Sequence, residues 1–282
     1  AAAMGGNLSL IGAPGNLIAQ SALQEMNMQF GFFEYARVGL PILVVGIIYF
    51  AFIGYKFLPN TEGDPDSVFN ETIDYSHVAD RKKILSLVIL VLTITAMIFE
   101  KQIGIKLHVI GSIGAILLVL TGVISEKEAY KAIDLKVIFL FGGTLALASA
   151  LDKTGAGALI AETVMNALGQ NASPFVLLFA IFMIAAVLTN FMSNTATTAL
   201  LVPISVSIAS SLGADPRAVL MATVIGGSLA YATPIGMPAN TMVLAAGGYR
   251  FRDYVKAGLP LIVVATIVSM VLLPILYPFF PA

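Results

Sequence analysis

The sequence predicts an all-α polytopic membrane protein that is built from two inverted repeats and contains a re-entrant hairpin and broken helices. Three observations lead to this fold class. The 282 residues are 58% hydrophobic and only 11% charged, whereas a soluble domain has about 45–50% apolar and about 25% charged residues. Long apolar runs recur along the chain, and blocks containing Gly, Pro and Asn occur twice in the same order.

The composition also excludes several classes of protein. The chain has 15 Lys and Arg against 16 Asp and Glu, a net charge of −1, so it lacks the basic surplus of a nucleic-acid-binding protein. It has no Cys, which excludes disulfides, thiolate metal sites and a Cys nucleophile, and two His are too few for a multi-histidine site. A lipid bilayer is therefore the expected surrounding of the chain.

Five apolar runs have the length of about 20 residues that crosses the hydrocarbon core of a bilayer, and they predict plain membrane helices at residues 38–58, 84–99, 107–124, 135–151 and 258–280. Two further apolar regions, residues 174–211 and 215–246, are interrupted by Pro, Gly, Ser, Asn and Thr, so we expect them to be broken inside the membrane. The amphipathic stretch 154–170 is expected to lie at the interface or to complete a bent span.

The sequence divides into five expected parts: residues 1–58, the end of the first repeat; 59–83, a polar cytoplasmic connector; 84–172, scaffold-type spans and the amphipathic segment; 173–257, a re-entrant hairpin and a broken helix; and 258–282, the last span. Most Lys and Arg residues flank one set of span ends. The positive-inside rule places those ends in the cytoplasm and the C-terminus outside. We expect an integral protein of the bacterial inner membrane.

Comparison of the chain with itself reveals two copies of one pattern. The matched blocks are residues 5–8 with 226–229, 12–16 with 236–240, and 39–42 with 258–261. Arg37 precedes a span that runs toward the basic side, whereas Lys256 precedes a span that runs away from it, so the copies are expected to be inverted in the membrane. Only four residues precede the first copy's block, so the first repeat is expected to be incomplete.

Polar residues cluster where one apolar run ends and the next begins, at Ser193, Asn194 and Thr195. This pattern is typical of the tip of a re-entrant hairpin, in which Asn194 or Thr195 caps the second helix. The free N–H groups and positive dipole end would attract an anion, while the side-chain and carbonyl oxygens would coordinate a small hard cation. Alternatively, these residues only pack between helices. The same two interpretations remain open for Thr189, Asn190, Thr197 and Thr198.

The second break contains Pro234 and Pro238, each of which deletes a helical N–H donor. We expect unwound loops at residues 12–16 and 236–240, with carbonyl oxygens free to bind a cation. The alternative for the second loop is a proline kink in an ordinary span.

Acidic and basic residues are missing from most of both broken regions. Neither Asp, Glu, Lys, Arg nor His occurs between positions 174 and 215 or between positions 218 and 249. Because proton relays and intramembrane proteases need titratable groups, the sequence favours Na⁺ as the coupling ion and argues against an enzyme.

These blocks together resemble the C-terminal half of the divalent anion/sodium symporter (DASS) family. The resemblance rests on Ser193–Thr195, the run 233–240, the run Gly248–Asp253 and the run 258–260, and residues 5–16 resemble the matching loop of the family's first repeat. It implies a homodimeric elevator-type transporter that carries di- or tricarboxylates, such as succinate, or sulfate together with Na⁺. Ala13 stands where Thr is common in the family, and the first Ser-Asn-Thr hairpin is not in this chain.

The resemblance also implies roles for individual residues. It implies that the small anionic substrate is bound by Ser193, Asn194, Thr195 and Pro234. It implies a second Na⁺ site formed by Ser193, Asn194, Thr195, Ala232, Thr233, Gly236 and Asn240, and a remnant of the first Na⁺ site formed by Gly12, Ala13, Pro14 and Asn16.

The expected function is therefore secondary active transport of divalent anions by Na⁺ symport. One alternative is a sulfate, arsenite or other inorganic anion permease of the same superfamily. An alternative of another class is a membrane subunit with a purely structural role.

Overall fold

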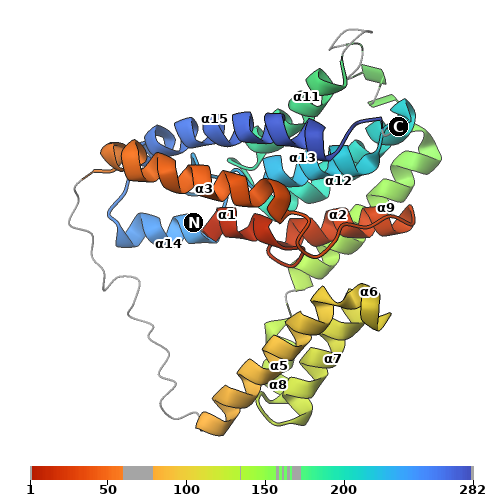
Figure 1. Ribbon diagram of the computed structural model, residues 1–282, viewed down its shortest axis with the longest axis vertical. Coiled ribbons are helices and arrows are strands. Elements are labelled where there is room, and N and C mark those ends of the chain that lie inside the picture. The colour runs from red at the N-terminus through yellow and green to blue at the C-terminus, as the bar shows by residue number, and fades with distance from the viewer. Residues whose placement is uncertain are drawn as a thin grey trace. The chain divides into compact units, whose positions relative to one another are not determined.

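The computed structural model describes residues 2–59, 79–133, 135–156, 159–160, 162–163, 166 and 173–280, and every regular element in these ranges is a helix. The chain forms two compact units. One comprises Ala1–Asn70 and Val137–Ala282, and the other comprises Glu71–Lys136 (Figure 1). The all-helical fold class predicted from the sequence is confirmed. The connector at positions 60–78 and most of the amphipathic stretch beyond position 156 lie outside the described residues.

The larger unit contains the two broken helices. Its helices are α1 (Ala2–Gly5), η1 (Gly6–Leu8), α2 (Pro14–Glu25), α3 (Ala36–Phe52), η2 (Gly54–Phe57), most of α9 (Leu135–Thr154), α11 (Pro174–Leu188), α12 (Asn194–Leu212), α13 (Pro216–Gly227), α14 (Pro238–Ala246) and α15 (Phe251–Leu276). Figure 1 shows α12 and α13 side by side, and α15 alongside α3.

Helix α13 forms the centre of this unit. All ten residues from Ala218 to Gly227 are buried, and the helix packs against α2, α11, α12 and α15. The close approach of α11 depends on Gly226, because a Cβ there would lie 2.6 Å from the carbonyl oxygen of Phe182. The segments on either side of the breaks are thus fixed against one buried helix.

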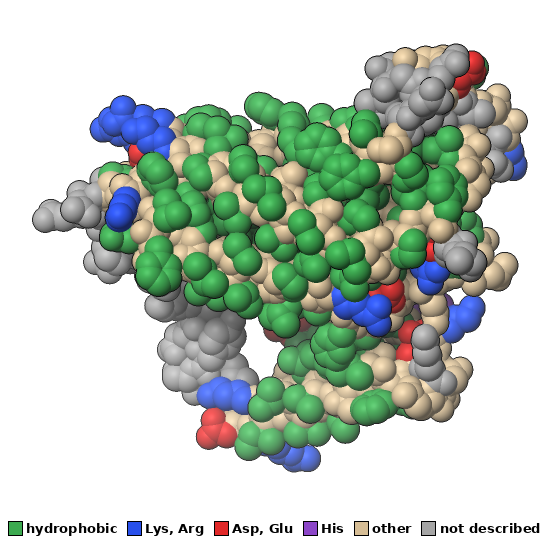
Figure 2. All heavy atoms as spheres, turned by 45° about the horizontal axis from the view of Figure 1, so that its top comes forward, with side chains coloured by type: hydrophobic (Ala, Val, Ile, Leu, Met, Phe, Trp, Pro, Cys, Tyr) green, Lys and Arg blue, Asp and Glu red, His purple; other side chains and the backbone are tan. Residues whose placement is uncertain are grey.

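The outer faces of α3 and α15 are apolar and exposed. Among the side chains that are half exposed or more are Leu40, Ile47, Ile48, Leu259, Val263 and Ile267, and hydrophobic side chains cover much of the face drawn in Figure 2. Helices α12 and α15 are long and apolar enough to cross a membrane, and α3, α7, α11 and α13 are shorter apolar helices. Apolar side chains on an outer face are expected where the solvent is lipid.

The smaller unit contains α5 (Asp80–Ile98), α6 (Glu100–Ile103), α7 (Leu107–Leu120) and α8 (Glu126–Ala132). Gly114 lets α7 approach α5, because a Cβ at this position would overlap Thr93. Ser125 and Glu128 form a capping box at the start of α8, and hydrogen bonds from the Ser125 amide and hydroxyl lower the pKa of Glu128.

The five plain spans predicted from hydropathy all coincide with helices, with shifted ends. The first expected span continues to position 58, but α3 ends at Phe52, where a short 3₁₀-helix replaces it. The last expected span starts at position 258, but α15 already begins at Phe251, where the Asp253 carboxylate accepts the Arg250 N–H. Hydropathy detects the apolar part of a helix and misses a polar first turn.

Candidate functional site

Both predicted breaks are real interruptions of helix, but they lie further upstream than the sequence indicates. Residues 9–13 and 228–237 are non-helical, and the chain returns to helix at Pro14 and Pro238. The expectation of unwound loops at 12–16 and 236–240 is therefore wrong at its C-terminal end. Proline suits the first helical position because its fixed φ matches the helix and its missing N–H is not needed there.

Asn240, in the first turn of α14, fastens the second loop. Its Nδ2 donates to the carbonyl oxygen of Ala230 at 2.7 Å and to that of Thr233 at 3.0 Å. The Asn240 carbonyl in turn accepts the Tyr254 hydroxyl at 2.6 Å. One amide group thus binds two parts of the unwound segment to the helix that follows it.

Asn16, in the first turn of α2, makes the same bonds in the first loop. Its Nδ2 donates to the carbonyl oxygens of Gly6 at 3.0 Å and Ser9 at 2.9 Å, and its own carbonyl accepts the Tyr35 hydroxyl at 3.2 Å. The two accepting carbonyls lie ten and seven residues upstream of the asparagine in both loops.

This hydrogen-bond pattern fixes the register of the two copies. When the two copies are aligned without gaps at the asparagine, Asn16 pairs with Asn240 and Gly6 pairs with Ala230. Sequence matching instead paired residues 5–8 with 226–229, three residues earlier. The shared Gly-Gly and Leu letters favoured that pairing, whereas the backbone is organised around the asparagine.

The sequence suggested that the carbonyl oxygens of the second loop are free, but several of them accept hydrogen bonds from side chains. Ala230 and Thr233 accept from Asn240, and the carbonyl of Pro234 accepts the Thr241 hydroxyl at 2.7 Å. The prolines delete main-chain donors, but side-chain amides and hydroxyls replace them. Each carbonyl oxygen retains a second lone pair, so a cation would share these oxygens with the protein.

Asn190, just after α11, connects the Ser-Asn-Thr break at residues 193–195 with the second loop. Its Nδ2 donates to the carbonyl oxygens of Ala186 and Leu229 at 2.7 and 3.1 Å, and its Oδ1 accepts the Ala232 N–H at 3.0 Å. The Thr233 hydroxyl donates to the Asn190 carbonyl at 2.5 Å. All of these bonds are buried.

Thr189 makes the second connection. Its hydroxyl lies 2.7 Å from Asn194 Oδ1 and 2.5 Å from the carbonyl oxygen of Gly227. Gly236 packs against the Thr189 carbonyl so closely that a Cβ would overlap it. The sequence left the roles of Thr189 and Asn190 open, and both contact residues about 40 positions away, which no local pattern reveals.

Ser193, not Asn194 or Thr195, caps α12. Its Oγ accepts the Ala196 N–H at 3.2 Å, and its backbone is extended. Helix begins at Asn194, so the cap must be the residue before it. Ser193 is exposed, whereas Asn194 and Thr195 are partly buried.

The N-terminal turns of α2 and α12 lie against each other. A Cβ at Gly15 would be 2.7 Å from Thr198 Oγ1, and the Thr198 hydroxyl donates to the Asn194 carbonyl at 2.9 Å. Asn16 Oδ1 and Thr197 Oγ1 are buried and have no hydrogen-bond partner in the part of the chain that the structure describes. The Gly12–Asn16 set and the Ser-Asn-Thr set therefore share one region.

This region offers neutral oxygen atoms and helix N-termini. Within the described ranges no group of three or more His, Asp or Glu could hold a metal ion. Hard cations are bound by oxygen ligands, and exposed N–H groups at a helix start favour an anion. Of the candidate residues, Asn194, Ala232, Thr233 and Gly236 are joined through Thr189 and Asn190, while Pro234 is buried beside them.

Tyr35 and Tyr254 were not among the candidate residues, although the sequence repeat contains both. Each hydroxyl holds the carbonyl of the loop asparagine. Their equal places in the two copies were the signal that could have identified them.

The chain is similar to known transporters. A family model described as citrate transporter (CitMHS) matches residues 1–226. The uncharacterized transporter YfbS of Escherichia coli is 38% identical over 55% of this chain and 25% of its own length. The uncharacterized transporter MJ0672 of Methanocaldococcus jannaschii is 30% identical over 98% of this chain and 62% of its own length.

The sodium-dependent dicarboxylate transporter SdcS of Staphylococcus saprophyticus is 26% identical over 98% of this chain and 58% of its own length. The resemblance to divalent anion/sodium symporters is thereby confirmed. The chain spans less than two thirds of the length of each of these three relatives.

Proposed function

The chain belongs to the citrate transporter (CitMHS) family of membrane transporters, and on that premise we propose that it forms part of a secondary active transporter that couples uptake of a divalent carboxylate to Na⁺. The observation that carries the proposal is the region where the starts of α2 and α12 meet two unwound loops whose groups are neutral oxygens and amides. The similarity to SdcS, a sodium-dependent dicarboxylate transporter, supports both the ion and the substrate class.

We assign the substrate to the start of α12 and the loop opposite it, with Ser193, Asn194, Thr195 and Pro234 as its ligands. The positive end of the α12 dipole lies at these residues, which favours a carboxylate without an obligatory Arg.

The second Na⁺ site comprises oxygens of Ser193, Asn194, Thr195, Ala232, Thr233, Gly236 and Asn240. The first site retains Gly12, Ala13, Pro14 and Asn16. The unpartnered Oδ1 of Asn16 supports this assignment, since a bound cation would satisfy that buried oxygen.

We further propose that the two copies are inverted repeats, that residues 174–211 form a re-entrant hairpin, and that a homodimer works by elevator-type alternating access. The matching bonds of Asn16 and Asn240 support the repeat. The opposite flanking charges support the inversion.

Succinate uptake into proteoliposomes tests the function. We expect uptake to require an inward Na⁺ gradient, and Asn194→Ala to reduce it at least about tenfold by removal of a ligand of the transported species. The free energy of unfolding of the Asn194→Ala variant should stay within about 1 kcal/mol of that of the parent protein, because Thr189 keeps its bond to Gly227.

Two outcomes separate the parts of this proposal. Uptake driven by a proton gradient, with no effect of Na⁺, would overturn the sodium assignment and leave the anion site standing. Uptake of sulfate in place of succinate would overturn the carboxylate assignment.

A further inference from the structure

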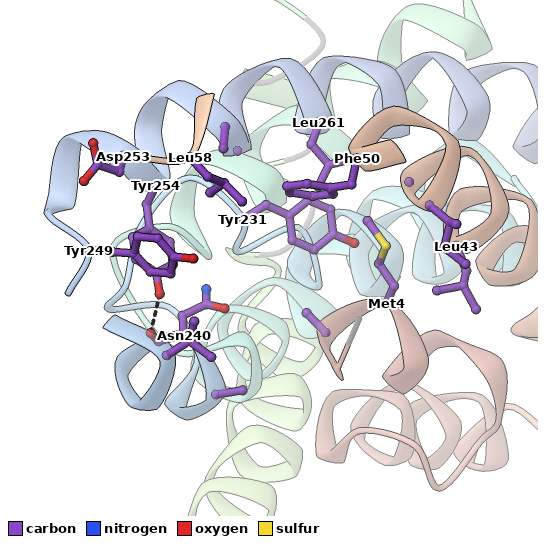
Figure 3. A pocket seen from close by; sticks show the side chains of 17 residues that line it. Met4, Leu43, Phe50, Leu58, Tyr231, Asn240, Tyr249, Asp253, Tyr254 and Leu261 are labelled. Atoms are coloured by element: carbon purple, nitrogen blue, oxygen red, sulfur yellow. Dashed lines mark hydrogen bonds between the residues drawn. The ribbon is translucent and has the colours of Figure 1, made fainter. Parts of the chain in front are cut away.

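A cavity of about 520 Å³ lies in the larger unit between α1, α3, α14 and α15. Its walls are mainly apolar, with Leu43, Phe50, Tyr231, Tyr249 and Leu261 among the lining side chains (Figure 3). This volume is within the range of small-molecule sites, about 300–1,000 Å³. The cavity does not include the residues at the start of α12, but Asn240, which is assigned to the second Na⁺ site, forms part of its wall.

The corresponding place in the other copy is filled. There the rings of Phe30 and Tyr35 pack edge to face at 5.1 Å, as those of Tyr249 and Tyr254 do beside the cavity at 6.3 Å. Tyr277 adds a third ring, 6.3 Å from Phe30, and is 5% exposed. Aromatic side chains thus close the space that stays open in the second copy.

One sequence difference contributes to the open space. When the match of residues 39–42 with 258–261 is continued without a gap, Leu58 falls opposite Tyr277, and a proline follows each of them. Leu58 lines the cavity without filling it.

The cavity is bordered by side chains that reach the outer surface. Ile47 and Val243 both line it and are 60% and 51% exposed. Ile47 belongs to the apolar outer face of α3, which lies in lipid in a membrane transporter. A molecule dissolved in the bilayer can enter there.

The polar groups near the cavity select for an uncharged molecule. No Lys, Arg or His occurs among its described lining residues, and the Asp253 carboxylate at its edge accepts the Arg250 N–H and lies 3.9 Å from Arg252 Nε. An anionic head group would find no cationic side chain among these lining residues.

One hydrogen-bond donor beside the cavity is unused. The Tyr231 hydroxyl is buried without a partner in the described part of the chain, and Figure 3 shows it directed toward Met4. An unpaired buried donor costs about 1–3 kcal/mol. The unbranched Met4 side chain adapts easily, so a ligand oxygen that displaces it would satisfy this hydroxyl.

We propose that this cavity binds an uncharged, membrane-dissolved molecule with an unbranched hydrocarbon chain and one acceptor oxygen, of which a monoacylglycerol is the simplest example. The hydrocarbon occupies the apolar space between α3 and α15. The Tyr231 hydroxyl donates to the ester carbonyl.

The test uses the protein in nanodiscs of dioleoylphosphatidylcholine and a monoacylglycerol with a diazirine in its acyl chain. After illumination, we expect the label on peptides of α3, α14 and α15. Leu58→Tyr, which introduces the ring that closes the other copy, should reduce labelling about tenfold or more. The control Ile48→Tyr adds the same ring to the lipid-facing side of α3, away from the cavity, and should leave labelling unchanged.

Two further arms test the chemistry. Tyr231→Phe should weaken labelling about fivefold through loss of one hydrogen bond, and the same chain presented as a free carboxylate should label less than the ester. Equal labelling of all lipid-facing helices, or equal labelling of the Leu58→Tyr and Ile48→Tyr variants, would overturn the proposal. Because labelling is measured without transport, its result does not depend on the proposed function.

Discussion

The two broken helices share one framework and differ in what surrounds it. In both, an asparagine in the first helical turn holds carbonyls ten and seven residues upstream, and a tyrosine holds the asparagine's carbonyl. Around the loop at Asn240, Thr189 and Asn190 supply further bonds from α11. Around the loop at Asn16, α12 lies close, and the Asn16 Oδ1 is left without a partner among the described residues.

The comparison distinguishes the hydrogen bonds that hold each loop in shape from the surrounding groups that could bind a ligand. The asparagine bonds recur because an unwound segment in a membrane must satisfy its own backbone. Within the described residues, the further bonds from Thr189 and Asn190 go to the second loop and to Gly227 just before it. Buried polar atoms without a partner in the described part of the chain lie at Asn7 and Asn16 in one copy and at Tyr231 in the other.

The largest expected effect comes from Asn190→Ala, which removes the side chain that joins the Ser-Asn-Thr break to the second loop. The substitution leaves the Leu229 carbonyl and the Ala232 N–H buried without their partner, and it also frees the Ala186 carbonyl. We expect a loss of about 3–4 kcal/mol in the free energy of unfolding, measured by thermal unfolding in detergent.

Asn194→Ala is the matched control, since it removes an asparagine only four positions away that is only partly buried. If Asn190→Ala unfolds at the same temperature as this control, the bonds of Asn190 do not stabilise the second loop.

The sequence predicted the positions of the helices and breaks better than the contacts within the breaks. Hydropathy located α3, α5, α7, α9 and α15, because lipid-facing and buried positions are both apolar in a membrane. Proline and glycine located the interruptions. These signals are local, and they carry information about each segment by itself.

The contacts depend on pairing across the chain. Thr189 reaches Gly227, 38 residues away, and Asn190 reaches Leu229, 39 residues away. The sequence indicated that polar side chains lie at these positions, but it did not identify the residues that they bind. It also treated the proline-flanked carbonyls as free, because the donor that satisfies them, the Asn240 amide, looked like a ligand itself.

A smaller effect is expected from the two framework asparagines. Asn240→Ala should cost about 2 kcal/mol, since two buried carbonyls lose a donor. Asn16→Ala loses the same two bonds but also removes an oxygen that is buried without a partner, so it should cost about 1 kcal/mol less.

Both variants should be unfolded in choline chloride and in sodium chloride. In choline chloride, Asn240→Ala should lower the free energy of unfolding more than Asn16→Ala does. A larger cost of Asn16→Ala than of Asn240→Ala in choline would contradict it, because the Asn16 oxygen would then have a partner in the protein.

The smallest effect is expected from Tyr35→Phe and Tyr254→Phe, which each remove one hydroxyl donated to a framework asparagine. The ring and its edge-to-face neighbour remain in both cases, so each variant should lose only about 1 kcal/mol. Thermal unfolding of the single and double variants measures this. The double variant should lose the sum, because the two hydroxyls have separate partners in separate loops. If the double variant loses much more free energy of unfolding than the sum of the single variants, the two loops stabilise each other. The hydrogen bonds of the two copies would then act cooperatively and not independently.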